Sequence, residues 1–298
     1  MASGPRRLDG AARRSRSRVA ALLAWPTLAL TGLVAVPFGL LVRISLASPD
    51  PSGMWTGAVT LDAYRDLLDG AFVRNLLYSL GLALLVAVAS VAVGFSLTYF
   101  ITRMRRQLQV VWLVFLLTTL SLSDVLIAFS WQVMLSKRAG LSNLFALMGM
   151  MDRPRSLAPN GAAVISNLIY LALPFTVLVL YPALSRLDSS LIEAARTLGA
   201  TPYVAFRSVV VPASKRPLIV ALVMSSVLTL GAYVAPIVLG KPEGWTVAVL
   251  IGNTALAGRN IPRAAAMALC LLGGVAALWI SAAGLWACAI WLRGRLQA

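Results

Sequence analysis

The stretch Arg186–Pro217 reads RLDSSLIEAARTLGATPYVAFRSVVVPASKRP and lies between two long apolar segments. Asp188 or Ser189 can cap a first helix, because short oxygen-bearing side chains accept hydrogen bonds from free backbone N–H groups. Gly199 suits the left-handed position that commonly ends a helix. Thr201, followed directly by a proline, offers a second helix start. The stretch therefore predicts two short helices joined by a Gly-Ala turn.

Apolar residues of the first predicted helix recur on one helical face. They are Leu187, Leu191, Ala194, Ala195 and Leu198. A connection between bundle helices usually has roughly 2–8 residues, so this longer one has a structure of its own. Periodicity alone is also compatible with a peripheral helix pair that rests on the bilayer.

The composition of the whole chain is that of a membrane protein. Of 298 residues, 59% are hydrophobic and only 12% are charged, whereas a soluble domain is about 25% charged. The net charge of +16 is explained by membrane orientation, and a nucleic-acid partner is not expected. The chain has no His and two Cys, so we expect no catalytic residues and no metal site.

Six stretches are long and apolar enough to cross a bilayer as helices, which takes about 20 residues each. They are Val19–Leu46, Val73–Ile101, Leu108–Leu135, Pro159–Ser185, Pro217–Leu239 and Ala264–Leu292. None alternates with the period of two that a barrel strand needs. The sequence therefore predicts an all-α integral membrane protein with six transmembrane helices.

The distribution of basic residues predicts the orientation. Sixteen of the 26 Lys and Arg lie on the side that includes both termini, which the positive-inside rule assigns to the cytoplasm. Residues 1–18 read as a disordered basic cytoplasmic tail that contacts anionic lipid, and residues 19–298 as the membrane domain. The first outer loop, Ala47–Phe72, predicts a loop with a short amphipathic helix.

The stretch Arg186–Pro217 resembles the EAA loop of the permease subunits of binding-protein-dependent ABC importers. That loop reads Glu-Ala-Ala, then Gly-Ala after three residues, then Phe after five more, and it ends in an aliphatic-x-aliphatic-Pro group. The matching residues here are Glu193, Ala194, Ala195, Gly199, Ala200, Phe206, Val209, Val211 and Pro212. The resemblance covers the chain from about Val73 to Leu292.

The resemblance implies a type I importer permease fold whose loop at about residues 185–215 binds a partner ATPase. The implied partners are an ABC ATPase dimer, a second permease that is similar or identical, an extracytoplasmic solute-binding protein, a small solute and membrane lipid. ATP and Mg would be used by the ATPase alone, so no cofactor is expected on this chain. The implied location is the bacterial plasma (inner) membrane.

An ionisable residue inside a membrane span is a candidate functional residue. Asp124 is the only acid well inside a predicted span. It is either a counter-charge for a cationic solute or a cap at a helix break. Trp131 and Gln132 lie on roughly the same helical face. A Trp there suits cation–π contact, although a Trp at the membrane interface is equally typical.

The fifth span resembles the spermidine/putrescine-type branch of these permeases. The resemblance rests on Gly231, Pro236, Leu239 and Gly240, and Tyr233 in the same stretch is a further candidate for the solute pathway. Ala232 departs from the branch, whose members often carry an acid there. Other expected solutes are therefore iron, thiamine, phosphonate, amino-acid-derived solutes or sugars. An ion-coupled secondary transporter is the alternative function, although one acid provides little for an ion relay.

Overall fold

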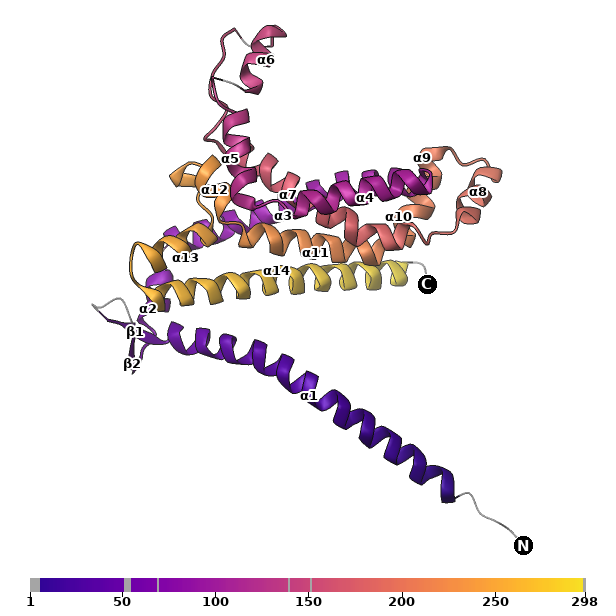
Figure 1. The fold of residues 1–298 in the computed structure, drawn as a ribbon, viewed down its shortest axis with the longest axis horizontal. Coiled ribbons are helices and arrows are strands. Elements are labelled where there is room, and N and C mark those ends of the chain that lie inside the picture. The colour runs from indigo at the N-terminus through magenta and orange to yellow at the C-terminus, as the bar shows by residue number, and fades with distance from the viewer. Residues whose placement is uncertain (1–5, 51–54, 69, 139, 151, 297–298) are drawn as a thin grey trace.

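The computed structural model describes residues 6–50, 55–68, 70–138, 140–150 and 152–296, with the backbone alone given for 6–23, 189 and 285–296. Long helices lie side by side in the bundle, as Figure 1 shows. In chain order the elements are α1 (Arg6–Ser45), β1 (Ala47–Pro49), β2 (Trp55–Val59), α2 (Asp62–Leu67), α3 (Gly70–Arg103), α4 (Arg106–Leu120), α5 (Asp124–Met134), α6 (Leu141–Leu147), α7 (Gly161–Leu184), α8 (Ser189–Thr197), α9 (Pro202–Ala205), the π-helical segment η1 (Phe206–Val210), α10 (Val211–Ala213), α11 (Lys215–Gly231), α12 (Val234–Leu239), the 3₁₀ turn η2 (Pro242–Gly244), α13 (Val247–Leu256) and α14 (Ile261–Leu296).

The core of the bundle is the contact among α3, α7 and α11. Small and hydroxyl side chains bring these helices together. A Cβ at Gly94 of α3 would lie only 2.6 Å from Cγ2 of Thr176 in α7, and the hydroxyls of Thr176 and Ser225 in α11 are 3.0 Å apart. The indole N–H of Trp279 in α14 donates to Ser226 of α11 at 3.1 Å. Such contacts stabilise helix association where lipid supplies no hydrophobic drive.

The spans agree with the predicted count, but two of them are broken. Four described helical segments are long and apolar enough to cross a membrane: Ala24–Ser45, Gly70–Arg103, Gly161–Leu184 and Ile261–Gly284. Two bent helix pairs raise the number to six if each pair counts as one span: Arg106–Leu120 with Asp124–Met134, and Pro202–Ala213 with Lys215–Gly231. The fold class predicted from the sequence is therefore confirmed.

The predicted span Leu108–Leu135 is broken, as one of the two interpretations of Asp124 requires. The chain bends by 94° between α4 and α5. Three hydroxyls near the end of α4 bond back to carbonyls four residues earlier: Thr118 to Val114, Thr119 to Phe115 and Ser121 to Leu117. Such back-bonding bends helices, and serines favour non-helical backbone. A hydropathy window registers none of these effects.

The fifth span, predicted at Pro217–Leu239, is interrupted within its Gly-to-Pro segment. Helix α11 ends at Gly231 and α12 begins at Val234, with an extended backbone at Ala232. The kink or unwound turn that Gly231 and Pro236 suggest is present. Irregular backbone at membrane depth is tolerated only beside a cavity or other protein, which directs attention to the space next to this break.

The first and outer segments differ in part from expectation. Helix α1 begins at Arg6, so it includes most of the segment expected to be disordered, and residues 1–5 lie outside the described residues. Arg and Ala are good helix formers, and they extend the apolar helix toward its N-terminus. The expected amphipathic helix of the outer loop is present as α2, beside a small antiparallel pair β1–β2. The apolar helix α13 lies in a segment predicted to be loop.

Candidate coupling loop and solute cavity

The start of α8 is capped as the sequence suggests. The Asp188 carboxylate accepts a hydrogen bond from the backbone N–H of Ser190 at 2.9 Å. Hydrogen bonds from the Ser190 backbone and side chain lower the pKa of Asp188 from its usual value, because they favour the ionised carboxylate. The choice between Asp188 and Ser189 as cap is therefore settled in favour of Asp188.

The end of α8 is a closed turn. Gly199 has a φ of +87°, in the left-handed region where glycine has no steric penalty. Its N–H donates to the carbonyl of Arg196 at 2.9 Å, and the N–H of Ala200 donates to that of Ala195 at 3.0 Å. These two bonds form a Schellman motif, which satisfies the last carbonyls of the helix. Thr201 then caps α9 by accepting from the N–H of Val204 at 3.3 Å.

One side of this loop packs on the bundle. The ring of Phe206 lies 5.4 Å from that of Phe95 and 5.1 Å from that of Tyr99, both in α3. Ile192 is buried in the same cluster, and Ala195 packs against it. Phe206, which the resemblance assigns to coupling, is thus the contact between the loop and the central helix of the bundle.

The other side of the loop is open. Leu198 is 89% exposed and Leu191 is 51% exposed, and Glu193, Ala194 and Pro212 are also exposed. The predicted apolar face is therefore only partly buried. Leu187 and Ala195 pack on the bundle, whereas Leu191 and Leu198 do not. Large apolar side chains left in contact with solvent are typical of a surface that another protein covers.

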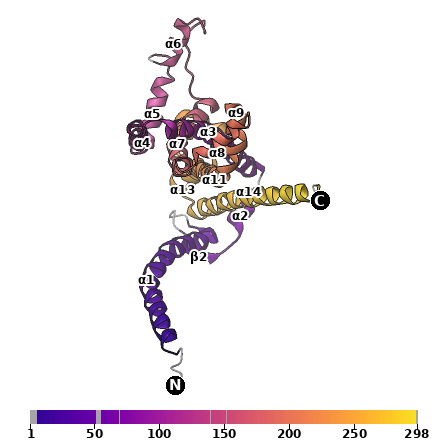
Figure 2. The same ribbon diagram turned by 90° about the vertical axis from the view of Figure 1, so that its right-hand side faces the viewer.

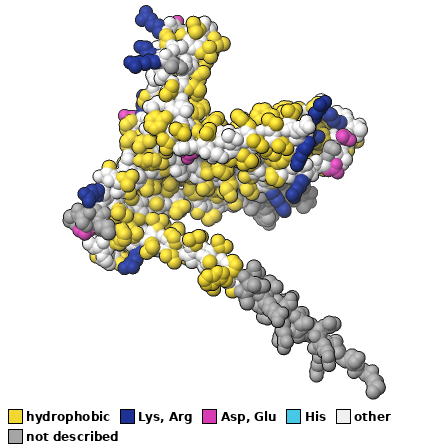
Figure 3. Space-filling view, in the orientation of Figure 1, with side chains coloured by type: hydrophobic (Ala, Val, Ile, Leu, Met, Phe, Trp, Pro, Cys, Tyr) yellow, Lys and Arg dark blue, Asp and Glu magenta, His cyan; other side chains and the backbone are white. Residues whose placement is uncertain are grey.

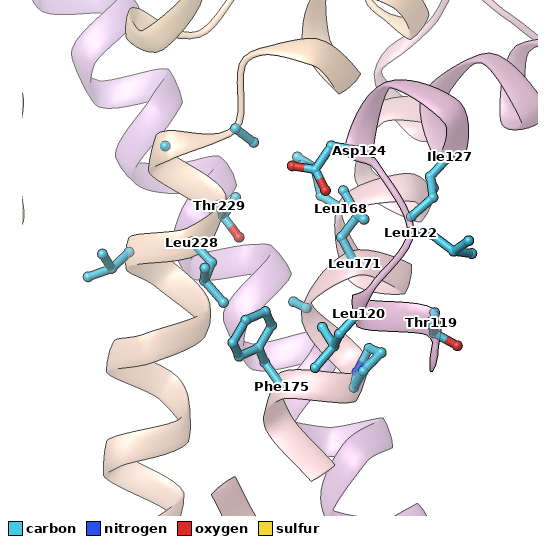
Figure 4. Close-up of a pocket in the computed structure, with 15 residues that line it drawn as sticks. Thr119, Leu120, Leu122, Asp124, Ile127, Leu168, Leu171, Phe175, Leu228 and Thr229 are labelled. Atoms are coloured by element: carbon cyan, nitrogen blue, oxygen red, sulfur yellow. The ribbon is translucent and has the colours of Figure 1, made fainter. Parts of the chain in front are cut away.

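A cavity of about 340 Å³ lies beside both helix breaks. Its lining comes from α4, α5, α7 and α11 together with the two interruptions. The lining residues are Thr119, Leu120, Leu122, Asp124, Ile127, Leu168, Leu171, Ala172, Pro174, Phe175, Val227, Leu228, Thr229, Gly231 and Ala232. In Figure 4 the carboxylate of Asp124 points into the space between α5 and α11. Asp124 is the one charged residue of this lining.

The surroundings of Asp124 bear on its two interpretations. Ser123 is the N-cap of α5, and its side chain makes no capping hydrogen bond. Asp124 is the first residue of the helix, where a negative charge interacts favourably with the helix dipole. The break that the cap interpretation requires is present, but Asp124 does not occupy the cap position.

The other predicted pathway residues do not belong to the lining. Trp131 stacks on Tyr170, with ring centroids 6.0 Å apart, and Gln132 is exposed outside the cavity. The ring of Tyr233 lies so close to Gly252 that a Cβ there would be 2.6 Å from it. Their role in solute passage stays a prediction.

Phe175 and Thr229 are among the lining residues that sequence reasoning missed. A signal was present for each. Phe175 follows a proline inside α7, and Thr229 comes two residues before the glycine that ends α11. Both therefore lie where a helix is locally weakened, which is where irregular membrane segments line cavities.

Residues 90–296 match the family described as binding-protein-dependent transport system inner membrane component. The chain belongs to this family. The spermidine/putrescine transport system permease protein PotB of Escherichia coli strain K12 is 26% identical to this permease over 220 residues, which cover 74% of this chain and 78% of that protein. PotB of Haemophilus influenzae is 24% identical over 251 residues, covering 84% and 86%. The inner membrane ABC transporter permease protein YdcU of Escherichia coli strain K12 is 27% identical over 228 residues, covering 72% of each chain.

A solved structure shares the fold of the permease. A chain of a bacterial ABC transporter involved in the import of the acidic polysaccharide alginate superposes with a TM-score of 0.69 at 21% identity. The match covers 92% of this chain and 95% of that one. The type I importer permease fold is therefore shown, and the family is one of inner-membrane transport components and not of enzymes. An ion-driven secondary transporter no longer accounts for the chain.

Proposed function

We propose that the permease forms half of the import pathway for a cationic solute, with polyamines as the first candidates. The observation that carries this proposal is Asp124, the single charge of a cavity that otherwise has apolar and hydroxyl side chains. A cation that enters the cavity meets a carboxylate at a helix break, and the ring of Phe175 lines the same cavity, as Figure 4 shows. Aromatic faces attract cations, most strongly where water is excluded.

The magnitudes show that the helix dipole alone does not offset a charge at the depth proposed for Asp124. A charge at membrane depth costs about 2.5–3.5 kcal/mol even on lenient insertion scales. The helix dipole typically returns about 0.3–1 kcal/mol. The difference must come from water in the open cavity or from a cation that replaces this water. Asp124 is exposed in the open cavity, so water solvates its charge until a cation replaces that water.

The fold alone does not select the solute. The alginate importer carries an acidic polysaccharide on the same fold, and folds of this kind support different functions through their sites. The two PotB relatives are named for spermidine and putrescine, and both solutes are cations. This agrees with the sign of the charge at Asp124. Ala232 supplies no second acid, so a longer polyamine would also need acids from another subunit.

The coupling loop supports a second part of the proposal. The exposed side of α8, with Leu191, Glu193 and Leu198, would bind one subunit of an ATPase dimer as a helix in a groove. Phe206 would then pass movement of the ATPase to α3 through Phe95 and Tyr99. A second permease would complete the cavity, an extracytoplasmic binding protein would deliver the solute, and both termini would be cytoplasmic.

The test is Asp124→Asn in the purified complex, because Asn keeps the size of the side chain and removes its charge. We expect normal assembly, unchanged basal ATP hydrolysis, and uptake of radiolabelled spermidine reduced at least about tenfold, or about 1.4 kcal/mol. Asp66→Asn, which changes an exposed outer acid, is the matched control and should transport normally. Normal uptake by Asp124→Asn, or a delivering protein that prefers an anion, would overturn the proposal.

A further inference from the structure

A second unusual region is the arm formed by α5 and the segment that follows it. Figures 1 and 2 show α6 standing away from the bundle in two perpendicular views. We call Ser136–Ser156 the arm tip. It is closed at its base by a hydrogen bond from the N–H of Leu157 to the carbonyl of Leu135, at 2.9 Å. The arm tip is therefore a small folded unit held beside the bundle.

Helix α6 of the arm tip exposes an apolar face. Leu144, Leu147 and Met148 are spaced by three and four residues, so they share one side of the helix. Leu147 is 86% exposed and Met148 is 65% exposed. The polar residues Ser142 and Asn143 bond back to the carbonyls of Ser136 and Arg138. The helix therefore has a polar side tied to its own loop and an apolar side without a partner among the described residues.

The same unit is strongly basic. Its sequence contains four cations and one acid, Asp152, for a net charge of +3. All four cations are exposed: Lys137, Arg138, Arg153 and Arg155. The part of the chain that the structure describes forms no salt bridge to any of them. Dark blue side chains near α6 in Figure 3 mark this basic patch next to the yellow apolar surface.

The arm leaves the bundle at a large angle. Helix α4 lies along α7 in the bundle, and α5 leaves it at 94°. The described long helices therefore leave the arm tip uncovered. An apolar helix face flanked by cations has the composition of an element that lies in the membrane interface.

We propose that the arm tip binds the headgroups of anionic phospholipids on the side of the membrane away from α8. Its apolar face enters the boundary between headgroups and acyl chains, and the four cations contact the phosphate groups. This inference goes beyond the transport function and does not depend on the identity of the solute. An acidic water-soluble protein would match the cations too, but it would leave Leu147 and Met148 in water between encounters. The bilayer covers them at all times.

The experiment uses the full chain with its co-purified partner subunits in lipid vesicles. Cys270→Ser and Cys288→Ser remove the native thiols, and Leu147→Cys carries a polarity-sensitive fluorophore. Vesicles contain phosphatidylcholine with or without phosphatidylglycerol, together with a lipid that bears a nitroxide quencher at its headgroup. We expect quenching of the fluorophore that is about twofold stronger when phosphatidylglycerol is present, because each basic residue near the surface is attracted to anionic lipid.

Two matched double variants test the role of the cations. Arg153→Gln with Arg155→Gln should abolish the phosphatidylglycerol-dependent part of the quenching. Arg74→Gln with Lys241→Gln, which neutralises two exposed cations outside the arm tip, should leave it unchanged. The proposal is overturned if the fluorophore reports water in both kinds of vesicle, or if phosphatidylglycerol has no effect. It is also overturned if an acidic solute-binding protein alone shields the fluorophore, which would assign the arm tip to that protein.

Discussion

Two turns between helices differ in how the free backbone groups at the helix ends are satisfied. The turn from Leu198 to Thr201 is closed by its own hydrogen bonds, with Gly199 in the left-handed region and Asp188 and Thr201 as caps. The turn at Ser121–Ser123 has no side-chain cap on α5 and opens beside a cavity that contains Asp124. The helix after the first turn is capped by a side chain, whereas the helix after the second starts with backbone hydrogen bonds only and leaves a carboxylate facing the cavity.

The difference agrees with the partner that we propose for each turn. A closed turn keeps its shape when a second protein presses on it, which suits the transfer of movement. An open break leaves backbone and carboxylate groups available to a solute, and membranes tolerate such backbone only beside a cavity. Disrupting the closed turn should therefore affect coupling, whereas changing the open turn should affect solute passage.

The largest expected effect comes from Phe206→Ala, because this ring joins the coupling loop to Phe95 and Tyr99. Removing it should destabilise the complex by about 3 kcal/mol, at the low end for a Phe-to-Ala change since the ring is only half-buried. The melting temperature of the complex should fall, and solute should no longer stimulate ATP hydrolysis. Tyr203→Ala, at an exposed position on the same loop, should have little effect. Equal loss in both variants would mean that the contact with α3 carries no special role.

The next effect comes from Gly199→Val. Nothing lies within 4 Å of a Cβ at this position, so the cost comes from the positive φ alone, about 1–2 kcal/mol. The turn should open and the ATPase should dissociate when the complex is purified in detergent. Gly199→Asn is the control, because Asn tolerates the left-handed region, and it should keep the ATPase bound. Retention of the ATPase by both variants would contradict the coupling role of the closed turn.

The smallest effect is expected from removing the side chains at the two cap positions, Asp188 and Ser123. Asp188→Ala should speed amide exchange in the first turn of α8, whereas Ser123→Ala should leave α5 unchanged because its side chain caps nothing. The pKa of Asp188 is lowered in the folded protein. The Asp188 carboxylate therefore stabilises the start of α8 fully at pH above the unfolded pKa of about 3.9. This stabilisation is lost as the pH falls through the lowered pKa. On acidification, protection of the α8 amides, measured relative to their intrinsic exchange rate at each pH, should fall in the native protein and stay constant in Asp188→Ala.

The closed turn could be predicted from sequence because its determinants are local. Asp188, Gly199 and Thr201 act within three residues of the groups they satisfy, so their spacing alone indicates the turn. The break between α4 and α5 was indicated only by Asp124, because hydropathy sums side chains and ignores the hydroxyls that bond back along α4. Helix α13 was missed because its ten residues are too few to count as a span.

The lining of the cavity could likewise be predicted from the sequence only in part. Asp124 was found because an acid at membrane depth is rare, and rarity is visible in one sequence. Phe175 and Thr229 are ordinary residues in an apolar helix, and only the packing of α7 against α11 places them beside Asp124. Trp131 and Tyr233 were chosen by type and position, but their rings pack on neighbouring protein groups. Three-dimensional packing decides which side chains reach the cavity.

Crosslinking tests most directly whether the exposed side of the closed turn contacts an ATPase, as we propose. A photoreactive group attached to Leu198→Cys, in the chain without native thiols, should form an adduct with the co-purified ATPase. The same group at Val59→Cys, an exposed position in β2, should form none. Absence of an adduct from Leu198→Cys in an intact, transport-active complex would contradict the account.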